Sequence, residues 1–179
     1  YKYTNTRHNI GFKIIDAINA HFKLSKQKPK FKGLLTTGNI DEKKIYAIKP
    51  LTFMNNSGTA IKELIDYFKI DAKDVFVFHD DMDIDFGKIK AKFGGSSAGH
   101  NGIESIDKFI GKDYSRVRIG IGHPKKKKKV NNHVLEDFKD DEEEKINDIT
   151  KNIVKQLSVL IEKKIDLFSS KVNQDLNGI

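Results

Sequence analysis

KKIYAIKPLTFMNNSGTAIKELIDYFKIDAKDVFVFHD, residues 43–80, is the stretch that decides the fold class. Its two ends, KKIYAIKP and DVFVFHD, are short and rich in β-branched and aromatic residues, which predicts two buried strands. Between them, NNSGTAIKELIDYF has the apolar spacing of a helix. This order of strand, helix and strand predicts a right-handed crossover, and therefore an α/β fold with a mixed or parallel sheet and helices on both faces.

Other segments extend this pattern in both directions. Apolar residues recur at helical spacing near the N-terminus and in the C-terminal third, whereas GKIKAKF and RVRIGIG alternate as strands with one polar face do. The run GGSSAG has the composition of a loop. The expected helices cover 10–22, 103–110 and, as one long helix, 142–168, and the expected strands cover 87–93 and 116–122. Together they predict a single three-layer α/β/α domain over residues 1–179, with a central mixed sheet.

Composition narrows the classes of protein. The chain has 179 residues and no cysteine, which excludes disulfides and thiolate metal sites. No apolar run approaches the roughly 20 residues needed to span a bilayer, so a cytoplasmic protein without a membrane partner is expected. A formal net charge of +8 suits an anionic partner such as nucleic acid, although a solvated basic surface explains the charge equally well.

Three polar residues stand where α/β proteins bind ligands, just after a strand or at a helix start: His8, Asn55 and Asp80. A histidine beside a carboxylate can act as a general base on water. Amides such as Asn55 and Asn101 can donate hydrogen bonds to an oxyanion, so together these residues would form an esterase site. Each residue alone is explained equally well as a helix cap.

Two further clusters each admit two interpretations. HDDMDID, residues 79–85, could hold a divalent metal or could be an acidic turn. Lys90 and Lys92 share one strand face, as do Arg116 and Arg118, so neighbouring strands would form a basic patch for phosphates. The alternative is a solvated strand face.

The lysine run at 125–129 adds charge that could attract a polyanion over a distance, with little specificity.

The motifs TRHNIGF, KPLTFMNNSG, VFHDDMDID, GGSSAGHNGIESI and YSRVRIGIGHP occur in this order. In order and spacing they resemble bacterial peptidyl-tRNA hydrolase, and they run from Tyr1 to about Pro124. The helix-rich remainder is compatible in length. The resemblance implies a monomeric α/β/α enzyme that hydrolyses the ester between a peptide and the 3′ end of tRNA, without a cofactor, a metal or an obligate protein partner.

The resemblance also implies roles for single residues. His8 matches the catalytic base and Asp80 the carboxylate that orients it. Asn55 and Asn101 match amides that hold the substrate and the attacking water, and His100 lies in the stretch that resembles the mobile lid. The cleft residues matched are Tyr3, Phe53 and Met54, and the residues matched to tRNA phosphate binding are Lys90, Lys92 and Arg118.

The chain departs from the family pattern at its beginning. The family starts with a strand and a glycine-rich turn, whose asparagine helps to distinguish N-blocked peptides from free aminoacyl groups, and neither precedes Tyr1. We therefore expect the domain to lack this strand and turn, with reduced activity and stability. The SSAG of the lid and the dense lysine run also differ from the pattern.

Two functions from other classes stay open. One is a metal-dependent phosphohydrolase built on HDDMDID, which a chelator would inactivate. The other is a tRNA-binding or ribosome-associated module without catalysis, which would bind tRNA and release no product.

Overall fold

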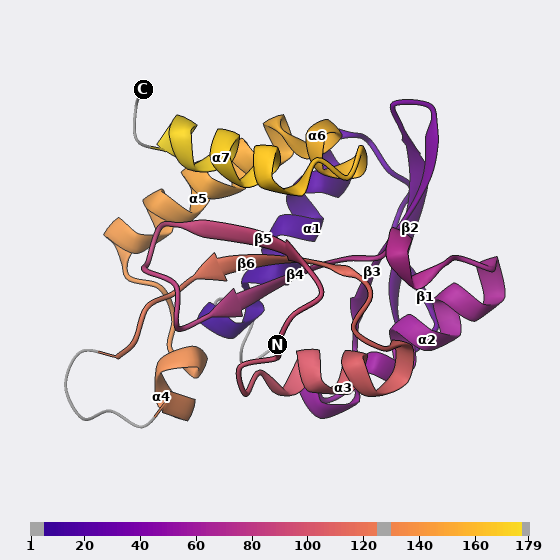
Figure 1. Ribbon diagram of the computed structural model, residues 1–179, viewed down its shortest axis with the longest axis horizontal. Coiled ribbons are helices and arrows are strands. Elements are labelled where there is room, and N and C mark those ends of the chain that lie inside the picture. The colour runs from indigo at the N-terminus through magenta and orange to yellow at the C-terminus, as the bar shows by residue number, and fades with distance from the viewer. Residues whose placement is uncertain (1–5, 125–129, 177–179) are drawn as a thin grey trace. The chain divides into compact units, whose positions relative to one another are not determined.

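The computed structural model of the chain describes residues 6–124 and 130–176. These residues group into two compact units, which are described separately (Figure 1). The first unit holds the described residues up to Ala17, then Val77–Lys92, and those from Arg116 onward. The second holds Ile18–Phe76 and Phe93–Ser115. Within the described ranges, no helix is both long enough and apolar enough to cross a membrane.

A mixed sheet of three strands, in the order β4-β6-β5, forms the centre of the first unit. Ser115 N–H donates to Val75 O and Ile121 N–H to Asp81 O, a constant offset that makes β6 parallel to β4. The bonds from Gly120 N–H to Lys88 O and from Gly94 N–H to Tyr114 O make β5 antiparallel to β6, as the arrows in Figure 1 show. The strands are β4 (Phe76–Asp81), β5 (Ile89–Phe93) and β6 (Ser115–Gly120).

The central strand β6 is buried on both faces, as the middle strand of a layered α/β fold should be. The predicted polar face of 116–122 is therefore wrong, since Arg116 is only 1% exposed. A two-sided core replaces the one-sided surface that the alternation predicted. The predicted α/β class, with a mixed sheet and helices, is confirmed.

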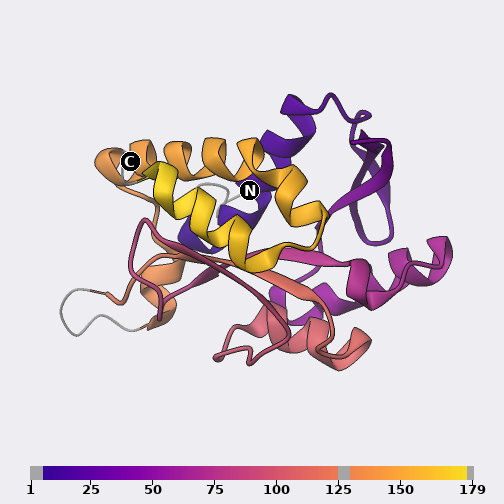
Figure 2. The same cartoon turned by 45° about the horizontal axis from the view of Figure 1, so that its top comes forward.

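Helices supply most of the remaining core of the first unit. They are the 3-10 helix η1 (Arg7–Asn9), the start of α1 (Ile10–His21), α4 (Val130–Leu135), α5 (Asp140–Lys155), α6 (Leu157–Ile161) and α7 (Ile165–Leu176). Figure 2 shows α5 and α7 lying side by side. Their fully buried side chains include Ile146, Ile149, Ile153 and Phe168.

The single long helix predicted over 142–168 is wrong, because the chain breaks there into α5, α6 and α7. Lys163 adopts a left-handed conformation with φ 64°, which ends α6. Lys164 N–H donates to Val159 O and Lys163 N–H to Leu160 O, so the last carbonyls of α6 are satisfied. The apolar spacing continues across the breaks, so it could not predict them.

Side chains of α7 cover the outer edge of β5. The Asn173 amide accepts from Ile89 N–H at 3.0 Å and donates to Ile89 O at 2.9 Å. Ser169 Oγ accepts from Ala91 N–H at 2.8 Å. The backbone groups of this edge strand therefore bond to a helix instead of a further strand.

The second unit has its own antiparallel sheet, in the order β1-β2-β3. Its elements are the end of α1, then β1 (Lys28–Lys30), β2 (Gly33–Ile40), β3 (Lys43–Pro50), η2 (Met54–Asn56), α2 (Ser57–Phe68), η3 (Ala72–Asp74) and α3 (Asn101–Ile110). Strand β3 and helix α2 confirm two predicted elements. The predicted crossover within one sheet is wrong, because β3 pairs with β2 whereas β4 pairs with β6.

Helices α2 and α3 cross closely at Gly58. A Cβ atom there would lie 2.3 Å from Ser105 O and 2.7 Å from Phe109 Cδ2, so only glycine allows this approach. Ser105 Oγ also accepts from Gly58 N–H at 2.9 Å. This crossing fixes the starts of both helices, where Asn55 and Asn101 stand.

Candidate functional site

His8 and Asp80 meet in the first unit. His8 lies in η1, directly before α1, and Asp80 lies near the end of β4. The distances from His8 Nδ1 to Asp80 Oδ1 and Oδ2 are 2.9 and 3.0 Å. The sequence therefore predicted correctly that a residue before a helix and one at a strand end would come together.

A glycine makes this meeting possible. A Cβ on Gly11, in the first turn of α1, would lie 2.3 Å from Phe78 O on β4. The start of the helix therefore rests directly on the strand, two residues from Asp80. This approach brings the His8 ring within hydrogen-bonding distance of the carboxylate.

The environment of the pair controls how His8 holds its proton. Its side chain is 20% exposed, and that of Asp80 is 4% exposed. Burial lowers the pKa of His8, but the hydrogen bond and the charge of Asp80 outweigh it, so the pKa lies above its ordinary value of 6.5. An ionised carboxylate only accepts hydrogen bonds, so Nδ1 carries the hydrogen and Nε2 is the basic nitrogen of the neutral ring.

The second unit gathers several of the other predicted residues. Asn55 lies in η2 and Asn101 is the first residue of α3, and both are exposed. His100 caps α3, because its Nδ1 accepts from the N–H groups of Gly102 and Ile103 at 3.1 and 3.2 Å. A Cβ on Gly102 would meet both Met54 Sδ, at 2.6 Å, and the His100 ring, at 3.0 Å, so η2 and the start of α3 lie against each other.

The role of His100 as a helix cap was missed in the sequence, where GHNG was read as part of a loop. A histidine directly before a helix start is the signal that could have shown it.

The predicted cleft residues differ in exposure. Phe53 is 84% exposed, an unusual state for a large apolar side chain, and Met54 is half-buried. Tyr3 lies outside the described residues, as does the lysine run 125–129.

The predicted basic patch holds together on neighbouring strands. The backbone bonds between β5 and β6 set a register in which Lys90 lies opposite Arg118. Lys90 and Lys92 are exposed and Arg118 is half-buried. Like charges directly opposite each other destabilise a sheet, so this pairing favours an anionic ligand over a solvated face.

The HDDMDID segment has the contacts of an acidic turn. Asp81 Oδ1 accepts from Asp83 N–H at 2.9 Å. Asp83 Oδ1 lies 2.8 Å from His123 Nε2, in an exposed pair that the sequence did not predict.

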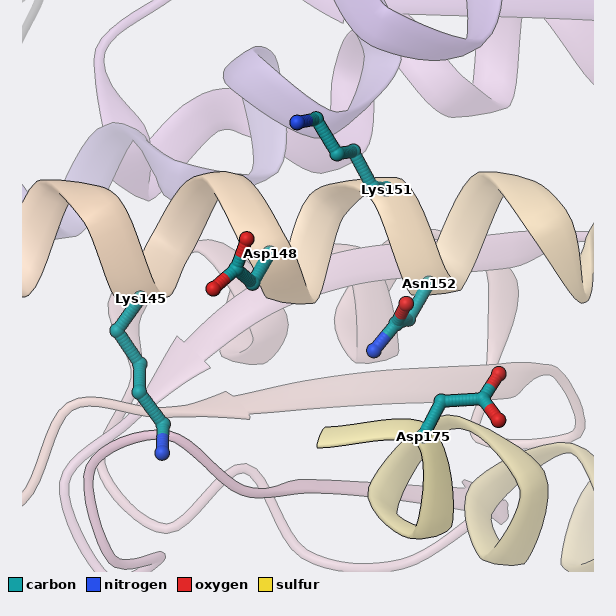
Figure 3. Close-up of a pocket in the computed structure, with 5 residues that line it drawn as sticks. All are labelled: Lys145, Asp148, Lys151, Asn152 and Asp175. Carbon is teal, nitrogen blue, oxygen red and sulfur yellow. The ribbon is translucent and has the colours of Figure 1, made fainter. Parts of the chain in front are cut away.

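A pocket of about 230 Å³ lies between α5 and α7, lined by Lys145, Asp148, Lys151, Asn152 and Asp175 (Figure 3). Its lining mixes both signs of charge and includes none of the predicted site residues.

The mixed α/β fold and the imidazole–carboxylate pair define a class: an α/β protein equipped for general-base hydrolysis. Comparison with known proteins gives the family. The family model described as Peptidyl-tRNA hydrolase matches residues 1–178. The chain therefore belongs to the peptidyl-tRNA hydrolase family, and its activity is the hydrolysis of peptidyl-tRNA.

Individual relatives agree. The peptidyl-tRNA hydrolase of Pelagibacter ubique is 73% identical over 169 residues, which cover 94% of this chain and 91% of that protein. That of Ehrlichia ruminantium is 44% identical over 171 residues, covering 96% and 88%. The crystal structure of peptidyl-tRNA hydrolase from Acinetobacter baumannii has a TM-score of 0.89 at 31% identity, covering 96% of this chain and 88% of that one.

Proposed function

We propose that the chain hydrolyses the ester bond of peptidyl-tRNA with His8 as general base. The observation that supports this most is the short contact between His8 Nδ1 and both oxygens of Asp80. His8 Nε2 takes a proton from water, which attacks the ester carbonyl, and Asp80 stabilises the imidazolium that forms. The tRNA ribose hydroxyl leaves, and the products are tRNA and a peptide with a free carboxyl group.

Amides supply the second part of the proposed mechanism. Asn55 or Asn101 holds the attacking water and donates a hydrogen bond to the oxyanion, and neither adds a charge that would change the pKa of His8. Their exposure and their places at two adjoining helix starts support this role. Tyr3, Phe53, Met54 and His100 are proposed to contact the peptide and the terminal adenosine.

Phosphates of tRNA are proposed to bind Lys90, Lys92 and Arg118, whose arrangement on β5 and β6 supports an anionic ligand. The enzyme is proposed to work as a cytoplasmic monomer in translation, as one domain over 1–179, without a metal, a cofactor or an obligate protein partner.

Hydrolysis of an N-acetylated aminoacyl-tRNA tests this proposal. His8→Ala is expected to lower kcat roughly 10²- to 10⁴-fold, with tRNA affinity nearly unchanged because phosphate contacts supply it. His21→Ala is the matched control, since His21 is an exposed histidine at the other end of α1. Its turnover should equal that of the wild type.

The same assay with a chelator separates the alternatives. Cleavage that survives chelation and depends on His8 supports the proposal. Activity that disappears with the chelator and returns with a divalent ion would point to a phosphohydrolase-like metal site instead. Binding of tRNA with no peptide release from any version of the chain would point to a binding module.

A further inference from the structure

Arg7, the residue directly before His8, is a buried cation with no role in the proposed mechanism. Its side chain is only 4% exposed. Its Nη2 donates to Glu142 Oε1 at 2.9 Å, at the start of α5. A buried charge is costly unless it is paired, so the fold retains this arginine only because its partners are in place.

Further partners come from the segment that joins α4 to α5. Arg7 Nη1 donates to the carbonyls of His133 and Glu136, at 3.2 and 3.3 Å. These carbonyls lie in and just after the last turn of α4, where the helix dipole is negative and favours a cation. The guanidinium also lies 5.6 Å from the centroid of the Phe138 ring.

The backbone is held to the same segment. Arg7 N–H donates to Glu136 O at 3.0 Å, and Thr6 forms an antiparallel bridge with Asp137. The chain immediately before His8 is therefore fixed by main-chain as well as side-chain contacts.

His8 extends toward a different partner from Arg7. Neighbouring residues of a 3-10 helix project about 120° apart, because it has 3.0 residues per turn. Arg7 reaches the α4–α5 segment while His8 reaches Asp80 on β4. The short helix η1 is thus attached on two sides, and the α4–α5 attachment sets the point from which the imidazole begins.

We infer that Arg7, held by Glu142, is a positioning residue for His8. It fixes the backbone of η1 so that the imidazole meets both oxygens of Asp80. This inference rests on the proposed role of His8. Arg7 does not touch the substrate in this role; it acts through His8.

Glu142→Gln tests the inference with almost no change of shape, and Glu143→Gln is its matched control. Glu143, the next residue of α5, pairs with Lys13 at 3.6 Å and does not contact Arg7 in the described structure. For Glu142→Gln we expect kcat to fall about tenfold with KM within about twofold, because a small misplacement of a catalytic group slows chemistry more than binding. Glu143→Gln should retain both values.

An NMR titration of the His8 ring gives a second readout that a merely structural role would not move. Loosening the contact with Asp80 should displace the His8 midpoint toward lower pH in Glu142→Gln and in Arg7→Met. Arg7→Lys should restore part of both effects, since lysine keeps the charge but not the planar fork that reaches several partners.

The inference is overturned if folded Glu142→Gln has wild-type kcat and a wild-type His8 midpoint, or if Glu143→Gln changes both equally. If Arg7→Met does not fold, Glu142→Gln decides alone. Should His8→Ala remain active, the proposed mechanism fails, yet the titration still shows whether Arg7 positions the ring.

Discussion

At the scale of single residues, the contact between His8 and Asp80 sets both reactivity and protonation. The carboxylate keeps Nδ1 protonated and raises the pKa of His8 against the effect of burial. A general base works only in its neutral form, so activity should rise with pH through a midpoint above 6.5.

Asp80→Asn should change both properties. The pKa of His8 should fall without the negative charge, so the rising limb of kcat/KM against pH moves to lower pH. The plateau should drop roughly 10- to 10³-fold, because the tautomer and the imidazolium lose support. Rates measured between pH 5 and 9 on N-acetylated aminoacyl-tRNA test this. A limb that stays in place would mean that another group titrates.

The same pKa has a consequence for stability. A pKa raised by folding means that the folded chain binds the proton more tightly than the unfolded chain. The stabilisation from this pair is therefore fully present below pH 6.5 and is lost as pH rises through the higher folded value.

At the scale of elements, the approach of α1 to β4 controls the site. Gly11→Ala should force the helix from the strand, because its new Cβ would overlap Phe78 O. We expect a loss of about 1–3 kcal/mol in the free energy of unfolding, as in other overpacked cores, and a lower kcat as His8 moves from Asp80. Urea unfolding and turnover measure the two effects.

Lys62→Ala, at an exposed position of α2 in a surface ion pair, serves as the stability control and should stay within about 0.5 kcal/mol. If Gly11→Ala kept wild-type stability and turnover, the close helix–strand contact would not be needed for catalysis.

Prediction from sequence worked best where local pattern and local structure agree. Helix α1, strand β3 and helix α2 follow apolar spacing closely, and the His8–Asp80 pair follows from the rule that strand ends and helix starts meet. Strands β1 and β2 went unpredicted, because LLTTGNI lacks strong alternation and gains its stability from pairing with β3.

Other features depend on contacts between distant parts of the sequence. The burial of Arg116 reflects its place in a central strand, and the pairing of Arg7 with Glu142 spans most of the chain. No local spacing contains that information. The signal available for Arg7 was a charged residue beside the predicted base.

At the scale of the whole molecule, the net charge of +8 should express itself in salt-dependent binding of tRNA. Lys90→Gln and Lys92→Gln are each expected to raise KM and to reduce the slope of log affinity against log salt by about 0.7–0.9, with kcat unchanged. Titrations between low and physiological salt measure the slope. Lys62→Gln removes an equal charge from α2 and should leave the slope close to that of the wild type.

An unchanged slope for both β5 variants would mean that these lysines are only solvated surface. A fall in kcat without a change in slope would instead place them near the reacting ester.

The cover that α7 provides for β5 matters for the behaviour of the protein at high concentration. A bare edge strand offers its N–H and C=O groups to any other extended chain and so promotes aggregation. Asn173 and Ser169 occupy these groups at Ile89 and Ala91. The last described helix therefore acts as a guard against self-association through this edge, a task separate from anything the enzyme does to its substrate.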